Sequence, residues 1–280
     1  MDLIQSVLMG IVQGLSEFLP ISSSAHLVFT SSAYKLYKGA EIIQHTNQEI
    51  FLEIMLHLGT LFAVLFFFKK DILRIFRSFY FGIKNKDYDN VDFKLGLYIV
   101  VGTIITVLIA FPLTSVAEKL VFLPAIVGAL LIFTGVLLLY SEYYYKKFNN
   151  KNELSLKHAI FIGMAQGLAS LPGFSRSGLT IAIAMLMGMD RERAARYSFL
   201  LSTPIIVGAS IAYPVLKIDL QEIITYNWGS IIAGTFVSGV VGYFCIKYFL
   251  KFLNKFSLSI FGYYCIFIGI VALMVFSRGV

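Results

Sequence analysis

The chain has 280 residues, of which 58% are hydrophobic and 14% are charged, and its formal net charge is +7. This composition is typical of membrane proteins and excludes an ordinary soluble globular domain. The positive charge does not indicate nucleic acid as a partner, because the Lys and Arg residues collect in short segments between apolar runs, as topology signals do.

The first segment, Met1–Ala33, is apolar but contains the polar stretch QGLSEFLPISSSAH from Gln13 to His26. It lacks a basic region before a small-residue cleavage site, so we expect it to be retained rather than removed as a signal peptide. Polar groups in hydrocarbon are costly and tend to mark function. Because Pro20 favours a break and serines are preferred helix N-caps, the segment is predicted to form a helix, a break and a second helix.

Six later runs are apolar enough and, at about 17–25 residues, roughly long enough to cross a bilayer. They are Phe51–Phe68, Leu95–Leu113, Phe122–Tyr140, Tyr197–Leu216, Trp228–Phe249 and Leu258–Phe276. A second interrupted segment, His158–Met189, stands between the third and fourth runs and carries Pro172 and Gly173 near its centre. Cys245 and Cys265 lie within spans, where a thiol behaves as a small hydrophobe, so we expect neither a disulfide framework nor a metal–thiolate site.

The distribution of Lys and Arg predicts the topology. Seventeen of the 23 lie in one alternating set of loops and five lie in the other, and the richer set is expected to be cytoplasmic. Both ends of His158–Met189 fall in the richer set, so this segment is predicted to be a re-entrant hairpin. The same interpretation of Met1–Ala33 places the N- and C-termini outside, although Lys35 and Lys38 argue mildly against it.

The two interrupted segments resemble each other. GIVQGLSEFLPISSSAHL begins at Gly10 and GMAQGLASLPGFSRSGLT begins at Gly163, and both contain G-x-x-Q-G-L, then Leu-Pro, then a Ser-rich stretch. Each is followed by three predicted spans, and because three is odd the second copy is inverted relative to the first. The alternative is chance similarity.

The predicted fold is therefore an all-α polytopic membrane protein with six transmembrane helices plus two re-entrant helical hairpins arranged as an inverted-topology repeat. Residues 1–280 form a single membrane domain, in which repeat 1 covers about 1–142 and repeat 2 about 157–280. This arrangement brings the two breaks together near the middle of the membrane, where irregular backbone is tolerated only around a buried or wet cavity.

Polar side chains surround the first break. The second half-helix of each hairpin would present free N–H groups and a positive dipole end, which together favour an anion. Gln13 and Glu17 are four residues apart and share one helix face. Ser22 and Ser23 precede His26 by four and three residues, so a hydroxyl and an imidazole also share a face.

The second break carries Arg176 between Ser175 and Ser177. Arg176 is the one basic residue that lies outside the loops, and a guanidinium suits bidentate contact with phosphate. A purely structural pair of Glu17 with Arg176 is the alternative. The whole set is better matched to a phosphate with a hard divalent cation. His57 could join the site, but it is interpreted as a structural histidine.

These stretches resemble a known family. QGLSEFLPISSSAH looks like the (E/Q)-x-x-x-E and P-x-S-S-x-x-H signature of the undecaprenyl-diphosphate phosphatases, the bacitracin-resistance family, and PGFSRSGLT is similar to their P-G-x-S-R-S-x-x-T signature. The resemblance covers essentially the whole chain. Carried over, the family's functional positions fall on Gln13, Glu17, Ser23, His26, Ser175, Arg176, Ser177 and Thr180. Gln13 stands where Glu is more frequent, Ala25 where Gly is usual, and Cys265 where Arg is frequent.

The resemblance implies a plasma-membrane phosphatase that converts the C55 lipid undecaprenyl diphosphate to the monophosphate carrier of cell-wall synthesis. It further implies a divalent cation, Mg²⁺ or Ca²⁺, an active site that opens outward, and competition by bacitracin through the substrate. A homodimer stays open.

In the mechanism that we expect, Glu17 and Gln13 hold the cation, Arg176 clamps phosphoryl oxygens, and His26 acts as general acid or base. The nucleophile is either Ser23, activated by His26, or a metal-bound water. The rival hypothesis is a transporter or flippase for a polyprenyl phosphate or another anion, because inverted repeats with broken helices are equally expected there.

Overall fold

The computed structural model describes residues 2–39, 47–120, 123–148, 152–217 and 220–276, and these residues form α-helices without a strand among them. The helices are α1 (Leu3–Ser16), α2 (Ser23–Tyr37), α3 (Asn47–Phe67), α4 (Lys69–Asn85), α5 (Val91–Leu120), α6 (Pro124–Phe148), α7 (Leu156–Leu168), α8 (Arg176–Leu186), α9 (Arg191–Lys217), α10 (Leu220–Ile224), α11 (Trp228–Leu253) and α12 (Ser259–Phe276). The prediction of an all-α protein is confirmed.

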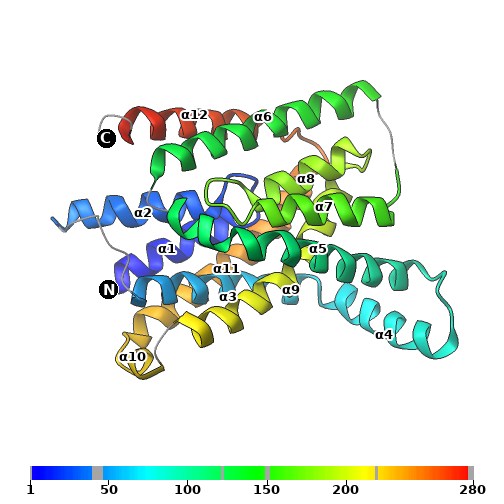
Figure 1. The fold of residues 1–280 in the computed structure, drawn as a ribbon, viewed down its shortest axis with the longest axis horizontal. Helices are drawn as coiled ribbons and strands as arrows, with labels where there is room; N and C mark the ends of the chain where they lie inside the picture. The colour runs from blue at the N-terminus through cyan, green and yellow to red at the C-terminus, as the bar shows by residue number, and fades with distance from the viewer. Residues whose placement is uncertain (1, 40–46, 121–122, 149–151, 218–219, 277–280) are drawn as a thin grey trace.

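Five helices are long and apolar enough to cross a membrane, namely α3, α5, α6, α9 and α11. They run broadly along the long axis of the molecule (Figure 1). The sixth predicted run forms α12, which is apolar but shorter than these five helices. The chain is therefore a multi-pass membrane protein, as its composition predicted.

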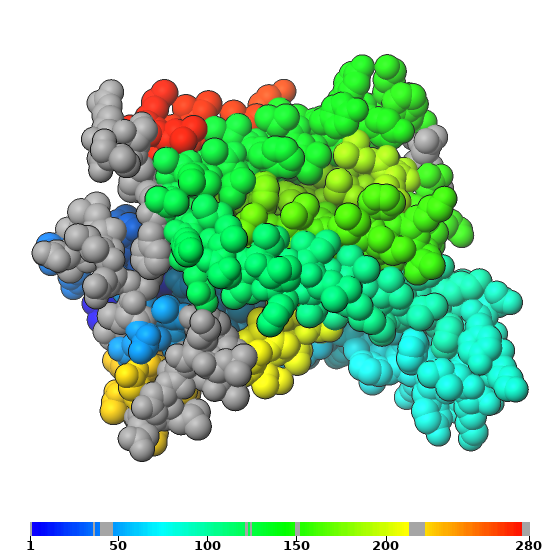
Figure 2. All heavy atoms as spheres, in the orientation of Figure 1, coloured from blue at the N-terminus to red at the C-terminus, as the bar shows by residue number. Residues whose placement is uncertain are grey.

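Helix α4 is not among the predicted elements, because the basic residues of its segment predict a loop between two spans. It begins directly after α3, with Phe68 between them. Phe76 and Tyr80 are exposed on it beside exposed basic residues such as Arg77. Together with the start of α5, this helix projects from one end of the molecule (Figures 1 and 2). Its apolar residues recur at helical spacing between the charges, which is the signal of an amphipathic helix.

Each interrupted segment forms two helices that pack on each other, α1 on α2 and α7 on α8. Between the helices, the chain leaves helical geometry at residues 17–22 and 169–175. Helix α1 packs along α11, and α7 packs along α5, so each first half-helix contacts a long helix from the other half of the chain. The predicted order of helix, break and helix is confirmed in both segments.

Glycines permit the close approach of these helices. A Cβ added to Gly163 of α7 would lie 2.7 Å from the carbonyl oxygen of Gly102 on α5. A Cβ added to Gly10 of α1 would lie 2.5 Å from the carbonyl oxygen of Gly234 on α11. In both places the obstacle is backbone, which cannot rotate away as a side chain can. Small residues at such crossings are typical of helix packing in membranes.

Gly163→Ala is therefore expected to destabilise the protein by about 1–3 kcal/mol, the usual effect of overpacking. Thermal unfolding of the detergent-solubilised protein measures this effect. Gly208→Ala is the matched control, because a Cβ at Gly208 would have no described atom within 4 Å. Equal melting temperatures for the two variants would contradict the packing of α7 on α5.

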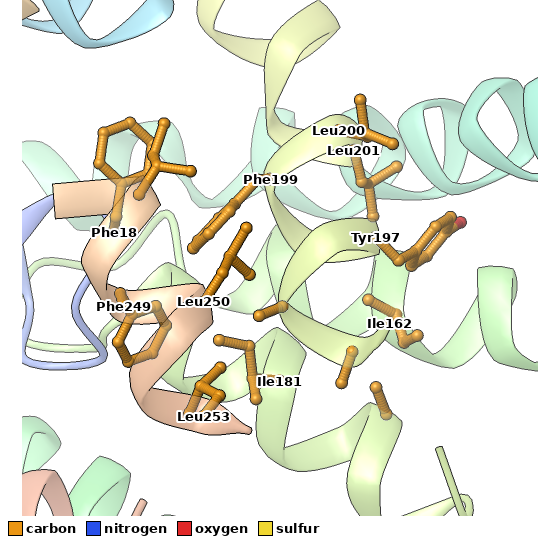
Figure 3. Packing of buried hydrophobic residues seen from close by; sticks show 14 of the residues in the cluster. Phe18, Ile162, Ile181, Tyr197, Phe199, Leu200, Leu201, Phe249, Leu250 and Leu253 are labelled. Carbon is orange, nitrogen blue, oxygen red and sulfur yellow. The ribbon is translucent and has the colours of Figure 1, made fainter. Parts of the chain in front are cut away.

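The main core lies beside the first break. Phe18 is fully buried, and its ring meets that of Phe199 edge-on, with the ring centroids 5.2 Å apart. Figure 3 shows Phe199 of α9 near Leu250 of α11 and Phe18. Because Phe18 directly follows Glu17, this packing fixes the backbone that carries the carboxylate.

Candidate active site

The carboxylate of Glu17 is the centre of a polar cluster. The Arg176 guanidinium donates from Nη2 to Oε1 of Glu17. Oε2 accepts from Nε2 of Gln13 at 3.0 Å and from Oγ of Ser23 at 2.8 Å. Nε2 of His57 lies 3.6 Å from the same oxygen. The two broken segments thus meet at one carboxylate, as the sequence predicted for Glu17 and Arg176.

Local structure explains why these side chains converge. Glu17 follows the last residue of α1, and its N–H still donates to the carbonyl of Gln13 at 3.0 Å, so both side chains point the same way. Ser23 is the first residue of α2 and Arg176 is the first residue of α8. Two helix N-termini therefore face Glu17, and such ends favour anions.

The second break is fixed by its own cap. Ser175 caps α8, and its Oγ accepts from the N–H of Gly178 at 3.1 Å. The N–H of Ser175 donates to Oγ1 of Thr134 on α6 at 3.2 Å. Gly173 has φ +102°, and a Cβ there would lie 2.5 Å from the carbonyl oxygen of Val127. Glycine is therefore required at this turn.

Two further predicted residues support Arg176. Oγ of Ser177 donates to the carbonyl of Leu19 at 3.0 Å, which joins the two breaks directly. Oγ1 of Thr180 donates to the carbonyl of Arg176 at 2.8 Å and lies 2.6 Å from Oγ of Ser198 on α9. Thr180 therefore lies behind the site, where it stabilises the first turn of α8.

Two buried polar atoms of the cluster have no hydrogen-bond partner in the described part of the chain, Oε1 of Gln13 and Nη1 of Arg176. Buried polar groups are normally paired, and exceptions call for a ligand or a water. Nη1 is a donor that an anion would satisfy, whereas Oε1 is an acceptor that a cation would satisfy. The residues therefore fit a phosphate together with a hard cation.

A cavity of about 630 Å³ opens in front of the cluster. Glu17, Ser23 and Arg176 line its polar part. Its walls continue between α3, α5 and α9, where Ile54, Ala110 and Ile206 make them largely apolar, although Glu53 and Glu118 also lie there. A phosphorylated headgroup with the first part of an apolar chain matches this distribution of polar and apolar surface.

His26 makes contacts other than the predicted one with Ser23. Its Nδ1 lies 2.8 Å from the carbonyl oxygen of Ser22, and its Nε2 lies 2.7 Å from the hydroxyl of Tyr264 on α12. The imidazole and phenol rings are stacked, with centroids 5.6 Å apart. The hydroxyl of Ser23 points instead to Glu17. His26 therefore faces α12.

Comparison with known proteins shows the family of the chain. The family model described as bacitracin resistance protein BacA matches residues 6–271. The chain belongs to the bacitracin resistance protein BacA family. It is 39% identical over 283 residues to an undecaprenyl-diphosphatase of Methanobrevibacter smithii, with 98% of each chain covered. It is 39% identical over 280 residues to one of Halothermothrix orenii, again with 98% of each covered, and 35% identical to one of Nocardioides sp., with 100% of this chain and 98% of the relative covered.

In this BacA-family chain the sequence favours a structural role for His57. Helix α3 places it beside Glu17 at the cavity, so it also borders the site. Its Nδ1 lies 2.7 Å from the carbonyl oxygen of Glu53, which can only accept, so Nδ1 carries the proton and Nε2 faces the site. The available signal was the spacing of Glu53 and His57, four residues apart on an apolar span.

Proposed function

We propose that the protein is an integral-membrane undecaprenyl-diphosphatase, which hydrolyses undecaprenyl diphosphate to undecaprenyl phosphate and inorganic phosphate and so recycles the lipid carrier of cell-wall synthesis. The observation that carries the proposal is the meeting of Arg176, Ser23 and Glu17 at two helix N-termini beside a largely apolar cavity. The names of the relatives support it.

Hydrolysis of a diphosphate mainly requires stabilisation of negative oxygens and an aligned nucleophile. Arg176 supplies a fixed charge and a spare donor at Nη1, and the dipole at the start of α8 adds to it. These groups bind the terminal phosphoryl oxygens in the proposed complex. The leaving group is undecaprenyl phosphate. Negative charge develops on it as the bond breaks, and Arg176 and the dipole of α8 offset that charge.

The nucleophile is Ser23 or a water in its place. Ser23 already donates to Glu17, so its attack on the terminal phosphorus would pass the hydroxyl proton to that carboxylate. The bridging P–O bond breaks, and a water then cleaves the phosphoserine. Transfer of the proton to His26 would first require its ring to leave Ser22 and Tyr264.

A divalent cation, Mg²⁺ or Ca²⁺, belongs to the proposal. Gln13 and Glu17 are the residues that would hold it, because Oε1 of Gln13 is buried beside the Glu17 carboxylate and has no partner among the described residues. Both metals prefer oxygen ligands, and Mg²⁺ sites use few carboxylates plus substrate phosphates. When bound, the cation would offset the charge of the diphosphate.

The proposed topology has six transmembrane helices plus the two hairpins in re-entrant positions, as an inverted repeat with external termini and a site that opens outward. The packing of α1 on α11 and of α7 on α5 supports it, since these pairs are equivalents between the halves. The last long helix of each half also contacts a break. Thr134 of α6 accepts from the N–H of Ser175 in the second break, and Cys265 of α12 donates to the carbonyl of Pro20 at 3.3 Å in the first.

Release of inorganic phosphate from a C55 lipid diphosphate by the purified protein tests the function. We expect a chelator to stop the release and Mg²⁺ or Ca²⁺ to restore it, and bacitracin to inhibit through the substrate. A flippase or an anion carrier would move its lipid or ion across a vesicle membrane without releasing phosphate, and that result would replace the proposal.

Ser23→Ala distinguishes the two nucleophiles. If Ser23 attacks, the variant is expected to lose about 10³-fold in kcat and to form no phosphoenzyme, because the attacking oxygen is gone. Rapid quench with radiolabelled substrate measures both quantities. Ser32→Ala, also on α2, is the matched control and should behave as wild type. Substantial turnover by Ser23→Ala would assign the attack to water.

A further inference from the structure

Both ring nitrogens of His26 have partners, Nδ1 in the turn before α2 and Nε2 on α12. A carbonyl oxygen only accepts, so the 2.8 Å contact with Ser22 places the proton of the neutral ring on Nδ1. Nε2 is then the acceptor, and the hydroxyl of Tyr264 donates to it at 2.7 Å. The nitrogen that could act as a base is thus covered by a phenol.

The partner of Nδ1 is an unusual residue. Ser22 has φ +71°, a left-handed conformation that is uncommon outside glycine and persists only where its surroundings fix it. Three contacts fix it here. The ring and the backbone N–H of His26 both donate to its carbonyl, at 2.8 and 3.3 Å, and its Oγ accepts from the N–H of Ala25 at 3.4 Å.

This turn determines where Ser23 points. Ser22 immediately precedes Ser23, so a change in its backbone angles would rotate the start of α2 and move the Ser23 hydroxyl from its 2.8 Å contact with Glu17. Helix α12 packs against this turn and stabilises it, because Tyr264 contacts His26 and Cys265 contacts Pro20.

We propose that His26 and Tyr264 are a positioning pair, which maintains the left-handed turn at Ser22 and thereby aims the Ser23 hydroxyl at Glu17. Tyr264 fixes the ring of His26, and the ring fixes the carbonyl of Ser22. The inference rests on the proposed phosphatase function and changes the role of His26 within it, from proton transfer to support of the nucleophile's backbone.

Three substitutions of His26 separate positioning from proton transfer. The amide nitrogen of His26→Asn stands at the same number of bonds from Cα as Nδ1 and can donate to Ser22, but an amide is not a base near neutral pH. His26→Gln places its amide nitrogen near the position of Nε2, and His26→Ala removes the side-chain donors and leaves only the backbone N–H.

Steady-state phosphate release from the lipid diphosphate is the measurement. We expect kcat to fall about 100-fold for the Ala and Gln variants, the effect of a misplaced reacting group, with KM unchanged. The Asn variant should stay within about tenfold of wild type, because it keeps the main hydrogen bond. If Asn is as slow as Ala, His26 transfers a proton and the inference is overturned.

Tyr264→Phe tests the outer member of the pair. It keeps the stacked ring and removes only the donor to Nε2, and kcat is expected to fall about tenfold. Tyr263→Phe is the matched control, since that neighbouring side chain is exposed on the surface of α12. Unchanged or faster turnover in Tyr264→Phe would contradict positioning, because freeing Nε2 would help a base.

Failure of the phosphatase function and failure of the positioning pair give different results. Absence of phosphate release by the wild-type protein, purified and reconstituted with Mg²⁺ or Ca²⁺, refutes the phosphatase itself. An active wild type with equally slow Asn and Ala variants refutes only the positioning pair. Melting temperatures near that of wild type in all variants would exclude unfolding as the cause of lost turnover.

Discussion

Replacing Arg176 by alanine is expected to lower kcat/KM for phosphate release by about 10³-fold, the usual effect of removing one donor to a developing negative charge. Arg176 makes a charged hydrogen bond to Glu17 with one nitrogen, and its buried Nη1, which has no partner in the described ranges, is available to the substrate. Arg176→Lys should recover only a small part of the lost kcat/KM, because an ammonium cannot contact Glu17 and a phosphoryl oxygen in the same fork geometry.

Arg193→Ala is the matched control, because this exposed arginine at the start of α9 pairs only with nearby Asp190 among the ion pairs of the described residues. It should leave phosphate release unchanged. If Arg176→Lys turned over as fast as wild type, the bidentate role of the guanidinium would be refuted. If Arg176→Ala did so, the cluster would not be the active site.

Glu17→Ala is expected to give the largest loss of stability, about 3–5 kcal/mol, because it leaves the buried charge of Arg176 uncompensated. Hydrolysis should also stop, since Glu17 orients Ser23. The double variant Glu17→Ala with Arg176→Ala should be more stable than Glu17→Ala alone, because the unpaired charge is gone. Chemical unfolding in detergent micelles measures all three variants and gives the coupling energy.

A double variant that is less stable than Glu17→Ala would contradict this account. It would mean that water in the cavity solvates Arg176 when its partner is missing, so that the ion pair contributes little to the free energy of unfolding. Glu222→Ala on α10 is a suitable control, because this carboxylate is exposed and contacts Asn47 rather than a buried cation.

The helices and the central pair of the site could be predicted, because each signal is contained in a short stretch of sequence. Apolar runs of sufficient length predict spans, and Pro20 with the serines after it predicts a break. A carboxylate and a guanidinium that are isolated in apolar segments strongly favour each other, which is why Glu17 and Arg176 could be paired across 159 positions.

Other features could not be predicted, because they depend on tertiary packing. The partner of His26 is Tyr264, 238 positions away, and nothing in the spacing around His26 indicates it. His57 joins the cluster because α3 packs against α1, which carries Gln13 and leads into Glu17. Helix α4 differs from its prediction for another reason: its basic residues fit topology signals in a loop, but they also alternate with apolar residues at helical spacing.

The separation of Glu17 from Arg176 also matters while the protein is being made. At about 5–20 residues per second, the intervening 159 positions take on the order of ten to thirty seconds to synthesise. During that interval the first hairpin has a carboxylate and no guanidinium to neutralise it. Stable insertion of the amino-terminal half is therefore expected to wait for the carboxy-terminal half, so that the ribosome's order of delivery and the order of folding differ.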